Sequence, residues 1–383
     1  MSNPLFDVIA LAVQAQFNPN RTRKYSGTAP PVCLVGPSGA GKNKGYIEPV
    51  VTGLGLACLI VNTPRNDAAE FNGIPWASEE KGCMEFLAPD WAVEVSKDPG
   101  KYVVFFDEAS DAPRSTQAAM HGLLTDGDCG NVSIRGAAMV MCMNPPEVAT
   151  TGGTISMPMG NRLFQVQAIV DRMNVIRQMR QGAWDVNKPV KLSPDWVHTI
   201  PASMAMVGSF LSNFPQHLII TEEDLQKRGE DMWKPAPTPR SWDFFWTLRA
   251  AAHASGQKHL MYLIAEGTVG APGIEYLQWE KDLEFGDPET WLSAPGLQTM
   301  PTGDDQRFAI INAVMAAVLA NNTPERWNKG WEFLDYMGEE CMDLAAIGAP
   351  MLAKNRGKAK GVPPAARKFM GLLQKSGLLG GAK

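Results

Sequence analysis

A glycine-rich segment limits most strongly what this 383-residue chain can fold into. Residues 36–43 (GPSGAGKN) directly follow the apolar run 31–35 and have the spacing GxxxxGK. In this motif the glycines let backbone N–H groups converge on phosphate oxygens, and the lysine reaches the terminal phosphates. The pattern predicts these phosphate-contacting residues: Gly36, Ser38, Gly39, Ala40, Gly41, Lys42 and Asn43. The alternative is an ordinary glycine-rich turn between a strand and a helix.

The first half of the chain contains apolar, β-branched runs separated by longer stretches with helical character. Continuous apolar runs are typical of strands buried on both faces, as in a parallel sheet covered by helices. Connections of this length suit crossover units. We therefore expect an α/β three-layer sandwich over residues 1–188. Its five predicted strands are 31–35, 56–61, 102–106, 138–142 and 163–167.

The remainder of the chain is expected to be helical. A lid at 189–290 with helices at 241–255 and 257–266 would precede a helical extension at 291–353. The extension contains the periodic segments 306–320 and 327–337, and a basic, flexible tail at 354–383 has one short helix at 365–373. At the other end, residues 5–17 predict an amphipathic helix rather than a signal peptide, because they include an aspartate and follow no basic residue.

Composition narrows the class of protein. The net charge is −5, but residues 354–383 hold eight basic and no acidic residues, which leaves the first 353 residues at −13. An acidic body argues against a protein that coats nucleic acid, and the tail is either solvated or an arm for an acidic partner. The apolar runs are shorter than a bilayer span, and six dispersed cysteines fit free thiols in the cytoplasm.

Two acids follow the apolar run 102–106. Asp107 and Glu108 would lie at the carboxyl end of a strand, where ligands bind in open α/β sheets. In nucleotide hydrolysis Asp107 would hold Mg²⁺, and Glu108 would orient and deprotonate the attacking water. The alternative is that the two acids only mark the start of an ordinary helix after this strand.

The run 139–143 ends in the same way, with Asn144 before Pro145. An amide at this strand end would contact the γ-phosphate or the attacking water. The alternative is a turn residue that precedes a proline.

In this order, these motifs resemble those of AAA+ ATPases, and most closely the MoxR-like branch. Further segments are similar to landmarks of that branch: 65–75, 110–130, 160–164, 237–242 and 286–289. The resemblance covers about residues 5–295.

The resemblance implies a homo-oligomeric ring, usually a hexamer, that hydrolyses ATP with Mg²⁺ at subunit interfaces and remodels a protein client. Such clients commonly carry a von Willebrand factor A domain. By motif match, Arg162 would reach the neighbour's γ-phosphate and Arg240 would sense nucleotide from the lid. The alternatives are a surface salt bridge for Arg162 and a helix-cap position for Arg240. Arg114 is a further cation near the site.

The segment that contains Phe71, Ile74 and Trp76 follows the second predicted strand. In the MoxR-like branch this region can carry an insertion that faces the pore of the ring, where it would touch a client. The alternative is a buried turn.

Asn43 departs from the pattern, which has Ser or Thr at this position. Its amide oxygen is a hard ligand for Mg²⁺ but lies one atom further from the backbone. Slow hydrolysis, binding without turnover, and a metal held mainly by Asp107 are all compatible with it; we interpret the site as a competent, slow ATPase. The other functional classes are a nucleotide-gated assembly protein and a DNA-acting motor, and the acidic body argues against the motor.

Overall fold

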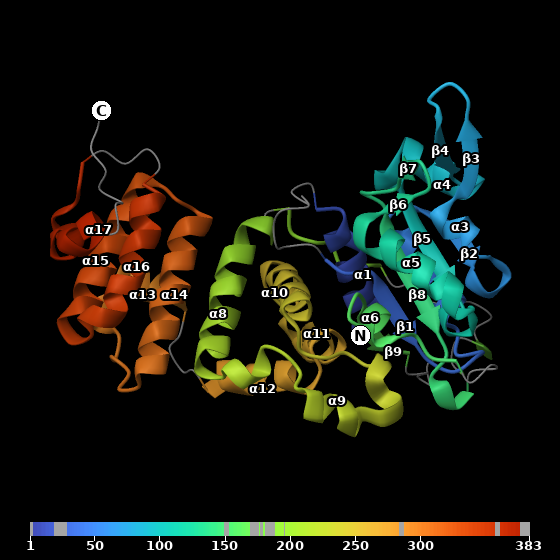
Figure 1. Ribbon diagram of the computed structural model, residues 1–383. Helices are drawn as coiled ribbons and strands as arrows, with labels where there is room; N and C mark the ends of the chain where they lie inside the picture. Colours follow the sequence, from blue (N-terminus) through green and yellow to red (C-terminus); the bar gives the residue numbers. More distant parts are fainter. Residues whose placement is uncertain are drawn as a thin grey trace. The chain divides into compact units, whose positions relative to one another are not determined.

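The computed structural model describes residues 3–18, 29–148, 153–168, 176, 179–180, 188–194, 196–282, 287–356 and 361–375. The chain divides into two compact units (Figure 1). The first contains Met1–Ser193 and Leu218–Ile274, and the second contains Pro194–His217 and Glu275–Lys383. The boundaries predicted at residues 188, 290 and 353 stay predictions. No helix in the described ranges has both the length and the apolar character needed to cross a membrane.

A five-stranded sheet forms the centre of the first unit, and its strands are all parallel. Its order is β2-β5-β8-β1-β9. The strands are β1 (Val32–Val35), β2 (Ala57–Asn62), β5 (Tyr102–Asp107), β8 (Ala138–Met143) and β9 (Phe164–Gln167). The five predicted strands and the parallel α/β sandwich are thus confirmed. With this order, the glycine-rich loop after β1 lies beside the end of β8.

The first helix, α1 (Pro4–Gln16), is more deeply buried than the sequence predicts. Eleven of its thirteen residues are buried, so the helix is not amphipathic in this fold. It packs against β8 and the helix α10 (Pro239–Ala254). Gln16 forms two hydrogen bonds with the backbone of Met139 in β8, donating to its carbonyl (3.2 Å) and accepting from its N–H (2.8 Å). An almost uncharged helix is therefore enclosed on most sides.

Further helices complete the first unit. They are α2 (Glu48–Gly53), α3 (Ala69–Asn72), α4 (Asp90–Lys97), α5 (Arg114–Asp126), α6 (Met157–Gly160), α9 (Glu222–Arg228) and α11 (Met261–Thr268). The predicted helices at 241–255 and 257–266 correspond to α10 and α11.

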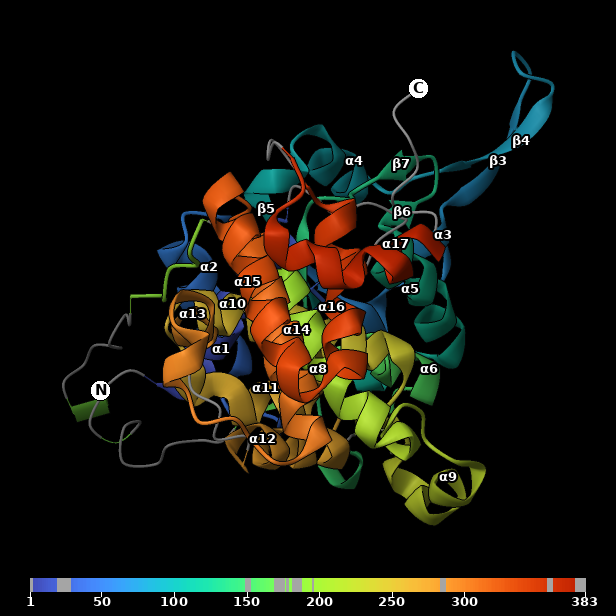
Figure 2. The same ribbon diagram turned by 90° about the vertical axis from the view of Figure 1, so that its left-hand side faces the viewer.

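Two antiparallel hairpins were not predicted. One consists of β3 (Ile74–Ser78) and β4 (Cys83–Leu87), and the other of β6 (Asp128–Cys129) and β7 (Val132–Ser133). The β3–β4 hairpin projects from the rest of its unit (Figures 1 and 2). Its apolar residues are therefore largely outside the core.

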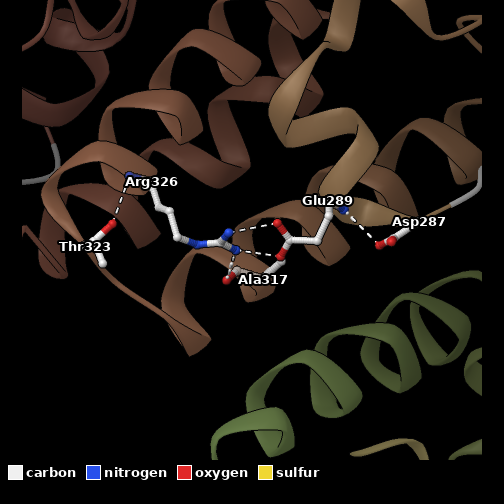
Figure 3. A network of polar contacts seen from close by, with 5 residues as sticks. All are labelled: Asp287, Glu289, Ala317, Thr323 and Arg326. Atoms are coloured by element: carbon white, nitrogen blue, oxygen red, sulfur yellow. Dashed lines mark hydrogen bonds and ion pairs between the residues drawn. The ribbon is translucent and has the colours of Figure 1, made fainter. Parts of the chain in front are cut away.

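The second unit is helical and has its own apolar core. It contains α8 (Ile200–Asn213), α13 (Pro288–Ser293), α14 (Asp304–Ala320), α15 (Pro324–Glu340), α16 (Met342–Lys354) and α17 (Met370–Lys375); α12 (Ala271–Asp282) crosses the division between the units. The Arg326 guanidinium donates to both oxygens of Glu289 (2.8 and 2.6 Å) and to the Ala317 carbonyl (2.8 Å), as Figure 3 shows. This network joins α13 to α14 and α15.

Part of the basic C-terminal segment belongs to this core, which differs from the expected flexible tail. Residues 364–375 form a 3₁₀ turn followed by α17, in agreement with the short helix predicted at 365–373. Ala366, Phe369 and Leu373 are buried, while Lys368 pairs with Asp335 (2.7 Å). Apolar residues three and four positions apart give this segment one face to bury.

Candidate functional site

The glycine-rich loop leaves β1 at the carboxyl edge of the sheet. The Gly36 N–H donates to the carbonyl of Met143, the last residue of β8 (3.1 Å). Gly39 and Gly41 have φ values of +77° and +75°, a region that residues with side chains rarely adopt. The chain then enters a π-helical turn over Lys42–Ile47, a geometry often found at functional sites. The sequence pattern thus corresponds to a loop with the required left-handed glycines.

This loop borders a cavity of about 230 Å³. Residues 38–44 line it together with Asp107, Glu108, Met143 and Asn144. The parallel strands bring these residues together, because the carboxyl ends of β1, β5 and β8 meet at one edge of the sheet. Most of the predicted site residues therefore share one cavity.

Lys42 is fixed at the base of the cavity by three acceptors. Its ammonium donates to the carbonyls of Gly36 (2.6 Å) and Pro37 (3.0 Å) and to Oδ1 of Asn144 (2.9 Å). The loop thus bends around its own lysine, which is also one of the residues that line the cavity.

The turn after β5 presents the two acids. The hydroxyl of Thr63 donates to the Asp107 carbonyl (2.6 Å), and the Glu108 N–H donates to Asp107 Oδ1 (3.0 Å). Glu108 has a φ of +55° and is the single non-glycine residue with positive φ in the described ranges. A left-handed non-glycine residue costs about 1 kcal/mol or more, and such conformations cluster at functional sites. This backbone turn leaves the Glu108 side chain exposed at the cavity.

Asn43 contributes an unused oxygen. Its Oδ1 is buried and finds no hydrogen-bond partner among the described residues, although the residue lines the same cavity as Asp107. A carboxylate and an amide oxygen are ligands that Mg²⁺ accepts. Asn43 and Asp107 are therefore a donor set that fits Mg²⁺, and the loop and Lys42 fit the phosphates of a nucleotide.

The two predicted arginines lie together in a second hollow of about 180 Å³. Its lining comprises Ala29, Pro30, Pro31, Leu124, Thr125, Arg162, Arg240, Asp243 and Phe244. Arg162 donates through Nε to the Thr125 hydroxyl (2.8 Å) and through Nη1 to the Pro158 carbonyl (2.5 Å). Partial burial lowers the pKa of Arg162, and the nearby positive charge of Arg240 lowers it further. Two arginines and one carboxylate, Asp243, thus share this hollow, and the charge of Asp126 acts on the pKa of Arg162 in the opposite direction.

The second hollow lies at the opposite edge of the sheet from the cavity. Pro31 precedes β1 and Arg162 precedes β9, whose Phe164 is in register with Val32. The loop follows the other end of β1, so four residues at about 3.3 Å each separate the two edges by roughly 13 Å. The two hollows share no lining residue. The structure therefore does not bring Arg162 or Arg240 to the cavity that holds Lys42.

Other residues considered from the sequence lie elsewhere. Arg114 lines a third hollow, of about 550 Å³, rather than the cavity. Phe71 is 1% exposed and packs beside Phe106, whereas Ile74 and Trp76 are 60% and 61% exposed on the β3–β4 hairpin. The alternative of a buried turn thus fits Phe71 alone.

The sequence reasoning missed Thr63, Ser110 and Asp111, whose contacts organise the site. Ser110 Oγ accepts from the backbone N–H of Asn144 (3.1 Å), and Asp111 Oδ2 accepts from its side-chain amide (3.3 Å). The available signal was the presence of two more polar residues on the turn directly after Glu108.

Comparisons with known proteins give one distant match. No protein-family model matches the chain, and no curated protein matches it. Among solved structures, the chain is similar to a candidate ATPase from Cytophaga hutchinsonii at 13% identity, with 76% of this chain and 84% of the other covered and a TM-score of 0.36. A likeness this distant says nothing about activity. The strand order, the phosphate loop and the acids at the strand ends are themselves those of a P-loop NTPase fold.

Proposed function

We propose that this protein is a slow ATP hydrolase of the MoxR-like AAA+ type, which acts as a ring and remodels a partner protein. One observation carries the proposal: the loop, Lys42, both acids and Asn144 line a single cavity. A glycine-rich turn without function would not require a strained glutamate and a polar strand end at the same edge of the sheet.

Each residue of the cavity has a chemical role in this account. The loop N–H groups and Lys42 bind the phosphates, and Asp107 with Asn43 would hold the Mg²⁺ that neutralises phosphate charge. Glu108 accepts the proton of the attacking water, and its exposed side chain lies where a water can reach it. Asn144 lies beside Lys42 and helps to orient the reactants.

The position of Arg162 supports an oligomer. Roughly 13 Å of strand separates Arg162 from the loop of its own chain, which exceeds the reach of an arginine side chain. If Arg162 neutralises the charge of the transferring phosphate, it therefore acts on the nucleotide of a second copy. We propose that Arg162 and Arg240 together face the nucleotide of the neighbouring copy. This proposal differs from the role that the family resemblance implies for Arg240, which is to sense nucleotide from a lid.

The β3–β4 hairpin is the proposed contact with the client protein. Ile74, Trp76 and Met84 are each at least 60% exposed. The register of the two strands places Ile74 and Trp76 on one face of the hairpin and Met84 on the other. The hairpin itself projects from the rest of its unit (Figure 2). Exposed apolar clusters of this kind mark interaction surfaces. A client with a von Willebrand factor A domain remains the expectation from the family resemblance.

Measuring ATP hydrolysis for the wild type and for Glu108→Gln tests the activity. Loss of the base should lower kcat about 10²- to 10⁴-fold with unchanged nucleotide affinity. Glu147→Gln, on the exposed turn after β8 and outside the cavity, should leave kcat unchanged. A wild type that binds ATP without hydrolysing it would instead support the nucleotide-gated assembly protein.

A further inference from the structure

Asn144 is held by three groups around a nearly buried side chain, which is 6% exposed. Its backbone N–H donates to Ser110 Oγ (3.1 Å). Its side-chain oxygen accepts from Lys42 (2.9 Å), and its side-chain nitrogen donates to Asp111 Oδ2 (3.3 Å). The amide therefore lies between a cation and a carboxylate.

The chemistry of these two neighbours allows one orientation of the amide. An ammonium group can only donate hydrogen bonds, and an ionised carboxylate can only accept them. A reversed amide would place its NH₂ group against Lys42 and its oxygen against Asp111, which leaves both contacts repulsive. Lys42 and Asp111 therefore fix the amide together, and Asp111 is the neighbour that still holds the nitrogen of Asn144 when Lys42 binds another acceptor.

Asp111 is also tied to the strained turn. Its backbone N–H donates to the carbonyl of Glu108 (3.0 Å), which closes the 3₁₀ turn Ala109–Asp111 directly after the left-handed residue. One short turn thus sets the backbone at Glu108 and the orientation of Asn144. Two of the acceptors that line the cavity, the Glu108 carboxylate and the Asn144 oxygen, thus depend on the same segment.

We infer that Asp111 is a positioning residue that makes Asn144 a hydrogen-bond acceptor in ATP hydrolysis, an inference that rests on the function proposed above. When a phosphate binds Lys42 in place of Asn144, the Asn144 oxygen is free to accept a hydrogen bond from one O–H of the attacking water. The Glu108 carboxylate then accepts a hydrogen bond from the other O–H. A water that donates to both directs its lone pair away from them, toward the phosphorus. Asn144 then acts on the water and not as a donor to the γ-phosphate.

Exchanging the two side chains tests this arrangement. Asp111→Asn replaces a group that can only accept with an amide that can accept or donate. Once a phosphate competes for Lys42, the orientation of Asn144 is then no longer fixed, and kcat should fall about tenfold with KM and ATP affinity within about twofold. Asn144→Asp places two carboxylates together and should be worse. In the double variant, the carboxylate at position 144 can accept from Lys42 and from the new amide at position 111, so kcat should return to within about threefold of the wild type. Asp343→Asn, an exposed position in the second unit, is the matched control and should change nothing.

The melting temperature without nucleotide gives a second readout that does not depend on turnover. Each single exchange should lower it by about 3 °C, and the double variant should recover most of the loss. If the wild type hydrolyses ATP and the double variant is no more active than Asn144→Asp, the acceptor role is overturned. If the wild type does not hydrolyse ATP, the proposed function fails separately, and the melting temperatures decide the pairing: recovery supports it, and additive losses overturn it.

Discussion

The cavity and the arginine hollow of the first unit differ in how their charges are compensated. In the cavity, Lys42 is surrounded by three acceptors, and two acids and an amide lie close by. In the hollow, two arginines lie near each other and near the carboxylate of Asp243, and neither arginine forms an ion pair with another described residue. The cavity resembles a nearly complete binding site, whereas the hollow holds two cations and one carboxylate.

The parallel sheet explains why these two sites are not one. The cavity lies at the carboxyl ends of the strands, and the arginine hollow lies at their amino ends. The length of a strand separates the two, so the fold of one chain cannot bring the arginines to the cavity. Each chain therefore carries both parts of the proposed site, the cavity and the arginine hollow, at opposite ends of its sheet strands. The following predictions test this division, beginning with the largest effect.

Removing the arginine should affect turnover and spare binding. Arg162→Ala should lower kcat by about 10³-fold, because an arginine finger contributes about 10³ to 10⁵ to phosphate transfer. Nucleotide affinity should change less than about twofold, since the cavity is untouched. Steady-state hydrolysis and the binding of a fluorescent ATP analogue measure the two quantities. Arg356→Ala, an exposed arginine of the second unit, should match the wild type in both; a large loss of affinity in Arg162→Ala would place this residue in its own chain's cavity.

Removing the lysine should instead weaken the binding of ATP. Lys42→Ala deletes the charged donor of the cavity, and charge-assisted hydrogen bonds contribute about 1.5–3 kcal/mol, so ATP affinity should fall about 10- to 100-fold. Isothermal titration calorimetry measures this loss. Lys101→Ala is the matched control, because Lys101 is exposed, does not line the cavity, and pairs with Asp98 (2.5 Å). Unchanged affinity in Lys42→Ala would show that phosphate binds elsewhere.

Much of the cavity could be predicted from the sequence because its parts are local patterns. The loop, the strand that ends in Asp107 and Glu108, and the strand that ends in Asn144 are each recognisable within a short stretch of chain. The parallel sheet then places them together without further information. The continuous apolar runs likewise identified all five strands of this sheet.

Contacts between distant residues could not be predicted in the same way. Asp111 and Asn144 are 33 positions apart, and Gln16 and Met139 are 123 positions apart, so only the folded topology shows that they meet. The β3–β4 hairpin was missed because its apolar residues are not buried and one of its strands contains Pro75, which argues against a strand by the usual rules. The pairing of Arg162 with Arg240 depends on the same distant contacts.

A smaller effect concerns the metal. Asn43→Thr replaces the amide with the shorter hydroxyl ligand of the usual motif, and kcat should rise by about two- to tenfold through better octahedral geometry. The Mg²⁺ concentration for half-maximal activity should fall as well, and a magnesium titration of ATP hydrolysis measures both. Asn43→Ala, which lacks any side-chain oxygen, should require more Mg²⁺ than the wild type. If Asn43→Ala titrates like the wild type, Asn43 is not a ligand.

The smallest effect is expected at the hairpin. Trp76→Ser should change the free energy of unfolding by less than about 0.5 kcal/mol, because the side chain is mostly exposed, and should leave basal hydrolysis unchanged. Chemical denaturation checks the stability. Phe71→Ala, in the same segment but fully buried, should cost about 3–5 kcal/mol. A large loss of stability in Trp76→Ser would identify the hairpin as part of the core.

The division of the site between chains is tested most directly by mixing two inactive variants. Glu108→Gln retains the arginine hollow, and Arg162→Ala retains the cavity. If each site takes its cavity from one copy and its arginine from the next, an equal mixture should recover about a quarter of the wild-type activity, since a quarter of head-to-tail contacts join two intact halves. The account predicts this recovery after the subunits have been allowed to exchange. A mixture as inactive as either variant alone, under conditions where exchange is demonstrated, would contradict it.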